Sequence, residues 1–217
     1  MAIDHFKAHY YQKDRVDWNF NILLDDQPDV IRMVNEYAPL LVQEGLYPSI
    51  PAKWLHMTIL RVGLTDDYTE DEMYRTADIL APKLATLKLP QLSFDSWWQW
   101  GGNIVFHISP HDDIVPVYNA VIESLRQVVG NDRTARTPHG NFIPHVSLAY
   151  TKDHHNEMKI IEVLSQSNIK PARFYAKSLS LLRQRPTDDG HYEWQIVKDM
   201  PIGVDGGTNI LSGSGMR

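Results

Sequence analysis

Hydrophobic positions along the chain repeat with two alternating periods, one of two residues and one close to 3.6. Segments with the two-residue period, or with a short continuous apolar run, predict strands. Segments whose apolar residues recur every three or four positions predict helices. Strands are therefore expected over residues 18–24, 54–62, 92–98, 103–109, 142–150, 176–182 and 192–198. Helices are expected over residues 28–41, 69–84, 112–128 and 153–165.

Local signals place several element boundaries. Pro28 suits the first turn of a helix, whereas Pro39 should kink or split the same helix. Thr69 followed by Glu72 matches a capping box, in which two side chains satisfy the first free N–H groups of a helix. Residues 101–102 are both glycine and predict a hairpin turn between the strands on either side.

The order strand, helix, strand, helix, strand occurs twice, which indicates a weak internal duplication. It predicts an α+β fold that is bilobal and duplicated, with two small, mainly antiparallel sheets. Each sheet should carry its helices on its outer face, and a central groove should separate the lobes. We expect residues 1–200 to form this single bilobal domain and residues 203–217, rich in Gly and Ser, to form a flexible tail.

Composition narrows the classes of function. The chain has no cysteine, which excludes disulfides, thiolate metal sites and cysteine nucleophiles, and fits a cytoplasmic location. No run approaches the ~20 apolar residues of a membrane span, so no membrane partner is expected. The net charge of −6 argues against an extended nucleic-acid surface, but it permits a small anionic ligand in a locally positive cleft. The expected state is a monomer.

Two short motifs carry the candidate chemistry. His56 is followed by Thr58, and His145 is followed by Ser147, each pair separated by one apolar residue and followed by two more. In a strand, residues i and i+2 project from the same face about 6–7 Å apart. The motifs occupy equivalent places in the two halves of the chain, so we expect both to face one groove.

Such a groove suits displacement at phosphorus. One group must take a proton from the attacking oxygen and another must protonate the leaving oxygen, and histidine can do either near neutral pH. The two hydroxyls can donate hydrogen bonds to the non-bridging oxygens of the phosphate. We therefore predict His56, Thr58, His145 and Ser147 as catalytic residues, with no metal and no other cofactor.

These stretches resemble a known family. Residues 54–63 and 142–150 are similar to the two signature motifs of the 2H phosphoesterase superfamily, which includes the 2′-5′ RNA ligase and cyclic phosphodiesterase proteins. Residues 178–182 and 192–197 resemble its last strand pair. The resemblance implies a bilobal fold with both motifs along a central groove. It also implies a small nucleotide or RNA terminus as partner, carrying a 2′,3′-cyclic phosphate or a 2′-5′ linkage.

Three further residues are candidates for substrate binding, each with a structural alternative. Trp98 could stack on a base or simply pack, and Arg183 could reach a phosphate or remain solvated. Tyr150 stands where many family members have a basic residue, which bears on the substrate. Strand alternation places Tyr150 and Arg61 on the faces opposite the histidines, so direct phosphate contact by Arg61 is not expected.

Two other functions remain open at this point. One is a binding module on the same fold, which holds a nucleotide or RNA terminus without turnover. The other is a metallohydrolase that uses His56 and His145 with carboxylates, although neither motif has the close ligand spacing common in metal sites. The sequence does not assign the acid and the base between the two histidines, nor does it choose between hydrolysis and ligation.

Overall fold

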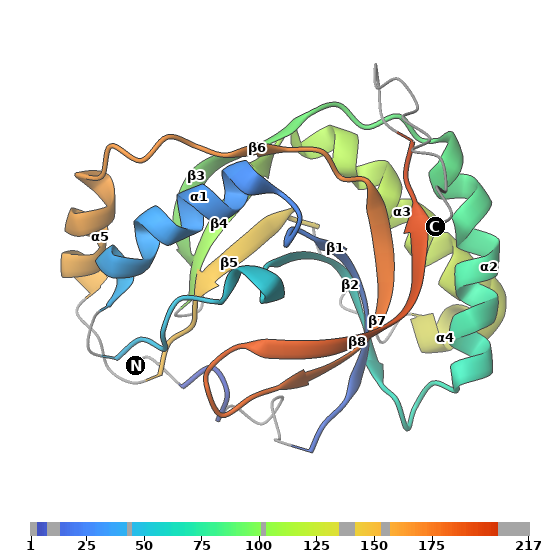
Figure 1. The fold of residues 1–217 in the computed structure, drawn as a ribbon. Coiled ribbons are helices and arrows are strands. Elements are labelled where there is room, and N and C mark those ends of the chain that lie inside the picture. The colour runs from blue at the N-terminus through green and yellow to red at the C-terminus, as the bar shows by residue number, and fades with distance from the viewer. Residues whose placement is uncertain are drawn as a thin grey trace, which may run out of the picture.

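A computed structural model describes residues 4–7, 14–42, 45–100, 103–134, 142–152 and 157–203, with the backbone alone for residues 99, 100 and 157. Its strands form a curled antiparallel sheet (Figure 1). The strands are β1 (Asp17–Leu23), β2 (His56–Leu64), β3 (Leu92–Trp100), β4 (Asn103–Ser109), β5 (His145–Ala149), β6 (Arg173–Phe174), β7 (Ser178–Pro186) and β8 (Tyr192–Pro201). Each of the seven predicted strands therefore overlaps an observed strand, and β6 was not predicted.

The helices are α1 (Pro28–Tyr37), α2 (Glu70–Thr86), α3 (His111–Val129), α4 (Asn131–Thr134) and α5 (Glu157–Ser165), with 3₁₀ turns at Ala38–Leu41 and Ala52–Trp54. Pro39 lies in the first of these turns, so the predicted split of the helix is confirmed. The predicted capping box at Thr69 and Glu72 is also present. At the end of α3, Gly130 has φ +82°, a left-handed conformation that favours glycine.

The sheet differs from the prediction of two separate sheets. The strand order is β6-β3-β4-β5-β2-β1-β7-β8, a single sheet of eight strands across the described residues. Its two halves meet where β5 pairs with β2, through Met57 opposite Val146. Both of these side chains are fully buried. The prediction was wrong on this point because the two histidine strands pair with each other at the centre of the sheet.

The halves of the sheet also exchange elements along the sequence. β3 pairs with β4 and β6, while β7 returns to pair with β1. Helix α1 packs toward β6, and α3 packs on α2 and β2. Figure 1 shows α1 and α5 at one side of the molecule and α2, α3 and α4 at the other. Each half of the fold is therefore built from both halves of the sequence.

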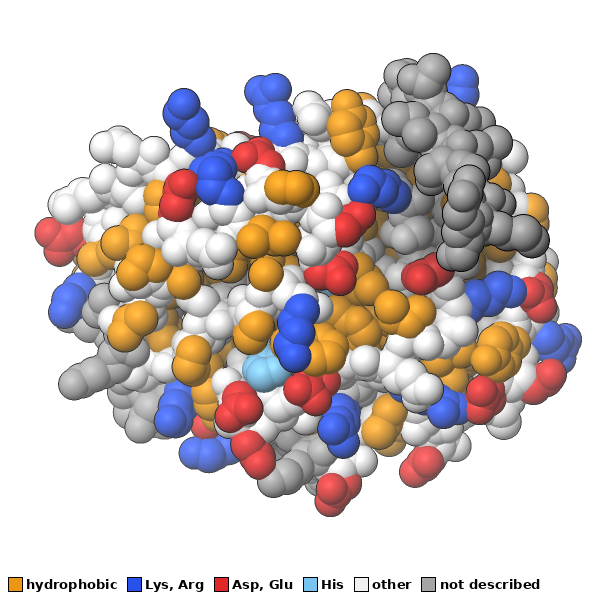
Figure 2. Space-filling model, in the orientation of Figure 1, with side chains coloured by type: hydrophobic (Ala, Val, Ile, Leu, Met, Phe, Trp, Pro, Cys, Tyr) orange, Lys and Arg blue, Asp and Glu red, His pale blue; other side chains and the backbone are white. Residues whose placement is uncertain are grey.

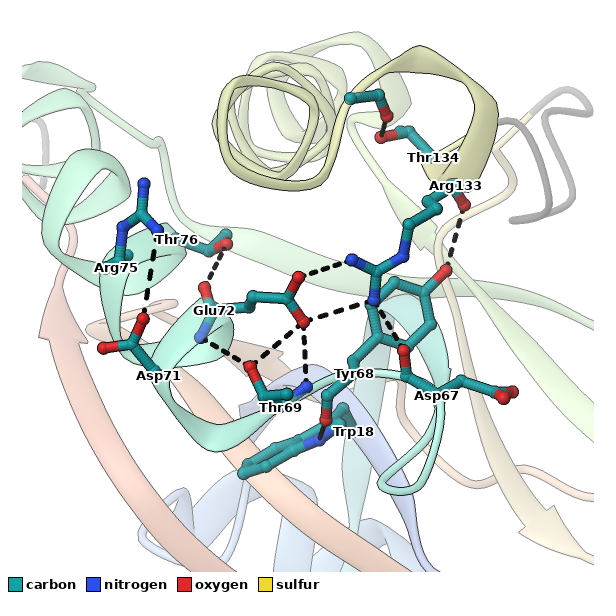
Figure 3. A network of polar contacts seen from close by, with 11 residues as sticks. Trp18, Asp67, Tyr68, Thr69, Asp71, Glu72, Arg75, Thr76, Arg133 and Thr134 are labelled. Carbon is teal, nitrogen blue, oxygen red and sulfur yellow. Dashed lines mark hydrogen bonds and ion pairs between the residues drawn. The ribbon is translucent and has the colours of Figure 1, made fainter.

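The start of α2 is fixed by a network of polar contacts (Figure 3). The Arg133 guanidinium pairs with the Glu72 carboxylate, which also accepts a hydrogen bond from the backbone N–H of Thr69 at 2.9 Å. The Tyr68 hydroxyl donates to the Arg133 carbonyl at 2.9 Å, and the Trp18 indole donates to the Tyr68 carbonyl at 2.8 Å. The network ties β1 to the turn after β2 and to α4.

The surface carries mixed charge. On the face shown in Figure 2, Lys and Arg side chains are interspersed with Asp and Glu side chains and form no single broad basic patch. Within the described ranges, no helix has the length and apolar character required to cross a membrane.

Two predicted features lie wholly or mainly outside the described residues. One is the hairpin turn at residues 101–102, and the other is the tail, residues 203–217, from position 204 onward. Gly203 itself is described, and its carbonyl accepts a hydrogen bond from the N–H of Leu89 at 3.1 Å.

Candidate active site

The two histidine motifs lie side by side at the centre of the sheet. Because Met57 stands opposite Val146 in an antiparallel pair, the same register places His56 opposite Ser147 and Thr58 opposite His145. Residues directly opposite share a face, with Cβ atoms about 4.5–5.5 Å apart. Both histidines and both hydroxyl residues line one pocket with a volume of about 240 Å³. The predicted convergence of the motifs is therefore present in the structure.

The rings of the two candidate catalytic histidines are held in the same way. The Nδ1 atom of His56 lies 2.9 Å from the carbonyl oxygen of Trp54, and Nδ1 of His145 lies 2.8 Å from the carbonyl oxygen of Ile143. A carbonyl can only accept, so Nδ1 carries the proton in both rings and Nε2 is the basic nitrogen of the neutral form. The motifs thus match in tautomer as well as in sequence.

Burial keeps both rings neutral in the absence of an anion. It lowers the pKa of His56 from 6.5 to about 4, an effect that the Trp54 carbonyl opposes and the nearby His145 reinforces. Burial also lowers the pKa of His145, and His107, directly opposite on β4, adds to this effect. A bound phosphate would act in the other direction, because an adjacent negative charge favours the imidazolium.

The pocket draws on several parts of the chain beyond the two motifs. Further lining residues come from the N-terminal segment, from β1, β2, β4 and β7, and from the ends of β5 and β8. They are His5, Asp17, Asn19, Arg61, Asn103, Tyr150, Gln184 and Tyr192.

Arg61 and Tyr150 reach this pocket because each motif strand contains a bulge. On β2, Thr58 pairs with Asn21 but Leu60 pairs with Phe20, so one extra residue lies between the two pairs. On β5, the pairings of Ser147 and Ala149 with β4 show the same extra residue. A bulge reverses the alternation of the residues that follow it. The expectation that Arg61 faces away from His56 was therefore wrong.

The two bulges also make Arg61 and Tyr150 equivalent positions. Each stands five residues after the histidine of its motif and directly beyond the bulge. The Arg61 guanidinium donates to the Asp17 carboxylate at 2.8 Å, and Arg15 lies 3.3 Å from the same carboxylate. One end of the pocket therefore carries fixed charge, while the equivalent position at the other end carries a phenol.

The other two substrate-binding predictions fall outside the pocket lining. The Arg183 guanidinium pairs with Glu70 and lies over the Trp18 ring, 4.9 Å from its centroid. Arg183 precedes Gln184, which lines the pocket, so its side chain lies on the opposite face of β7, where Glu70 of α2 pairs with it. Trp98 is 59% exposed and stacks on His107 with centroids 6.4 Å apart. It stands on the pocket side of the sheet, two strands beyond His145.

The residues that cover His56 were not predicted from the sequence. The Trp194 ring meets the His56 ring edge-to-face at 5.0 Å, and Tyr192 does so at 6.4 Å. Both come from β8, whose position over the pocket depends on the long β7–β8 hairpin. The described parts of the chain contain no group of three or more His, Cys, Asp or Glu side chains arranged to hold a metal ion.

The chain is similar to known proteins in sequence pattern and in fold. The family model of the 2′-5′ RNA ligase superfamily matches residues 26–188. The structure of TT0787 of Thermus thermophilus has a TM-score of 0.66 at 13% identity, and the match covers 87% of this chain and 99% of that chain. The structure of apo E. coli LigT has a TM-score of 0.55 at 14% identity, and the match covers 87% of this chain and 98% of that chain. The structure of the MHV ns2 PDE domain has a TM-score of 0.51 at 17% identity, and the match covers 78% of this chain and 99% of that chain. No curated protein matches in sequence.

Proposed function

Because the chain belongs to the 2′-5′ RNA ligase superfamily, we propose that it is a metal-independent phosphodiesterase. Its proposed substrates are nucleotides or RNA ends that carry a 2′,3′-cyclic phosphate or a 2′-5′ linkage. The observation that carries the proposal is the matched pair of histidines in one pocket, each with Nδ1 bonded to the carbonyl two residues before it. Binding alone does not call for two such rings, whereas displacement at phosphorus uses one group as a base and one as an acid, and a histidine can serve as either.

In the proposed reaction, the neutral imidazole of one histidine takes a proton from water through Nε2. The water oxygen bonds to phosphorus, and the bond from phosphorus to one ribose oxygen breaks. The other histidine, protonated at Nε2, gives its proton to that leaving oxygen. For a 2′,3′-cyclic phosphate the product is a phosphate monoester, and a 2′-phosphate is the one expected for this family. The reverse reaction at the same site would join two ends.

The hydroxyls of Thr58 and Ser147 complete this arrangement. In the observed register each hydroxyl residue stands directly across from the histidine of the other motif. A phosphate between the two rings would therefore have a hydroxyl donor on each side, placed to stabilise the charge that develops on its non-bridging oxygens. E. coli LigT, which shares this fold, has been crystallised with phosphate and with 3′-AMP, which supports a nucleotide phosphate as ligand.

Arg61 is the proposed electrostatic anchor for the substrate phosphate. Replacing it with methionine keeps much of the side-chain length but removes the charge, and should raise KM for a cyclic nucleotide about 10-fold, because a charge-assisted contact contributes about 1.5–3 kcal/mol. Arg15→Met, which removes the other cation beside Asp17, is the matched control and should change KM less. Steady-state kinetics on both variants test this assignment, and equal KM values for Arg61→Met and the unmodified protein would contradict it.

Trp98 has a separate proposed role. Its exposed ring, on the same side of the sheet as the motifs, is placed to stack on a nucleotide adjoining the one that reacts. This contact would serve an RNA end and not a mononucleotide. Arg183 has no part in the proposed site, because Glu70 and Trp18 hold its guanidinium elsewhere.

A panel of phosphodiesters tests the proposed function. It comprises 2′,3′-cyclic nucleotides, 2′-5′ oligonucleotides and ADP-ribose cyclic phosphate, each assayed with excess EDTA. We expect turnover of at least one of them at a rate that EDTA does not change. Turnover that EDTA abolishes would favour the metallohydrolase. Tight binding of a nucleotide without any turnover would favour the binding module.

The lowered histidine pKa values predict the pH dependence of that turnover. The base must be neutral, so activity rises as the pH passes its pKa, and the acid must be protonated, so activity falls as the pH passes its pKa. Both pKa values lie below 6.5, so kcat/KM should follow a bell-shaped curve with its maximum on the acid side of pH 6.5. The kcat maximum should lie at higher pH, because the bound phosphate raises the pKa of the acid. A kcat/KM that climbs steadily from pH 6.5 to 8 would contradict this prediction.

A further inference from the structure

The N-terminal segment, residues 4–7, brings one residue, His5, into the wall of the active-site pocket. The backbone N–H of His5 donates to the Thr151 carbonyl at 2.9 Å, directly after the second motif strand. The Nε2 atom of His5 lies 2.9 Å from the Tyr192 hydroxyl. Behind the ring, the buried Asp4 carboxylate accepts a hydrogen bond from the Tyr47 hydroxyl at 3.2 Å. The segment is thus fixed on both sides of His5, and His5 lines the pocket.

His5 covers the residue that is equivalent to Arg61. Its ring stacks on Tyr150 with centroids 4.3 Å apart and an interplanar angle of 26°. Tyr192 meets both rings edge-on, at 6.0 Å and 5.6 Å. Tyr150 is only 4% exposed beneath these neighbours, whereas His5 is half-buried. His5 therefore shields one face of Tyr150, and both residues line the pocket.

This end of the pocket carries no positive charge near neutral pH. Burial lowers the pKa of His5 to about 4, although the Asp4 carboxylate opposes the effect, and the charge of Arg61 adds to it. Tyr150, Tyr192 and the amide of Asn103 are uncharged. The wall offers aromatic surface together with groups that donate and accept hydrogen bonds, at a position where the near-symmetry of the pocket would otherwise place a second cation like Arg61.

That chemistry matches a nucleobase better than a second phosphate. A base is planar, stacks on aromatic rings and has donors and acceptors along its edge, whereas a phosphate dianion needs cations or N–H donors. We propose that His5 and Tyr192 form the base-binding end of the pocket. The N-terminal segment would then favour a substrate that places a nucleobase at this end over one that places a second phosphate there. The inference rests on the proposed function for the identity of the substrate.

The test compares two ligands by isothermal titration calorimetry on the full chain, so that it does not depend on turnover. One is adenosine 2′-monophosphate and the other is inorganic phosphate, which lacks the base. His5→Ala should weaken binding of the nucleotide about 10-fold, in line with the loss of one stacking contact, and should leave phosphate binding within about 2-fold. His5→Phe keeps the ring over Tyr150 and should retain nucleotide affinity within about 3-fold. Lys7→Ala is the matched control: it removes an exposed cation that pairs with Asp4 but does not line the pocket, and it should change neither affinity.

The outcomes separate this inference from the proposed function. Equal weakening of both ligands by His5→Ala would mean that His5 supports the pocket as a whole, and unchanged binding of both would mean that it contacts neither; each result overturns the inference. The proposed function depends instead on turnover of the phosphodiester panel. It can therefore fail while the base-binding role of His5 stands, and the converse also holds.

Discussion

Alanine in place of His56 or of His145 is expected to lower kcat for any accepted phosphodiester by about 10²- to 10⁴-fold. Each ring supplies one of the two proton transfers, and its Nδ1 bond to a backbone carbonyl aims Nε2 for that step. The double variant should be little worse than either single one, because residues that act as a unit are not additive. Steady-state kinetics measure the effect, and a circular dichroism melting curve checks that each variant folds.

His111→Ala is the control for these variants. His111 lies on the first turn of α3, its side chain is 48% exposed, and it does not line the pocket. Its ring bonds to the Phe142 carbonyl at 2.8 Å and to Asp112 at the surface, so its loss should leave kcat within about 3-fold of the unmodified protein. If His56→Ala or His145→Ala behaved like this control while folded, the assignment of acid and base to these two rings would fail.

Removal of a motif hydroxyl is expected to have the second largest effect. Thr58→Val or Ser147→Ala should lower kcat by about 10²- to 10³-fold, the usual loss for one donor to a developing negative charge. KM should change much less, since the hydrogen bond strengthens mainly in the transition state. The measurement is the separate effect on kcat and on KM, with the same cyclic nucleotide for both variants.

Thr86→Val is a matched control for Thr58→Val. Thr86 ends α2, far from the motifs in the sequence, and its hydroxyl bonds locally to the Lys83 carbonyl at 2.7 Å. This change should not alter kcat. A loss that appears only in KM, or no loss at all, would mean that Thr58 and Ser147 do not stabilise the transition state.

The sequence was sufficient to predict the motif pair and most of the elements. Alternation within two strands placed His56 beside Thr58 and His145 beside Ser147, and both pairs line the pocket. Thr69 and Glu72 form the capping box expected from their spacing, and the predicted helix is split near Pro39, as expected. These features depend on neighbours within a few residues, which is the range that local patterns report.

Bulges explain the prediction that failed at Arg61. A strict two-residue period predicts that Arg61 lies on the face of β2 opposite His56. The bulge adds one residue before Arg61, so its side chain lies on the pocket face instead. The same change of parity on β5 brings Tyr150 inward. A bulge arises from pairing with the neighbouring strand, so the motif strand alone does not reveal it. The two bulges fall at the same place relative to the histidine of each motif.

Long-range pairing was the other source of error. The period of a segment predicts a strand but does not name its partner, so the direct pairing of β2 with β5 could not be foreseen. The contact between His5 and Tyr192 in the pocket could not be predicted for the same reason, because 187 positions separate these two residues in the sequence. A lone histidine near the start of a chain gives no signal of such a role.

A crystal structure with adenosine 2′-monophosphate bound tests most directly whether the two histidines act on one phosphate. We expect the phosphate to lie between the two rings, with Nε2 of His56 and Nε2 of His145 each within about 3.2 Å of a phosphate oxygen. A phosphate held by only one of these nitrogens, or bound outside the pocket where β2 meets β5, would contradict it.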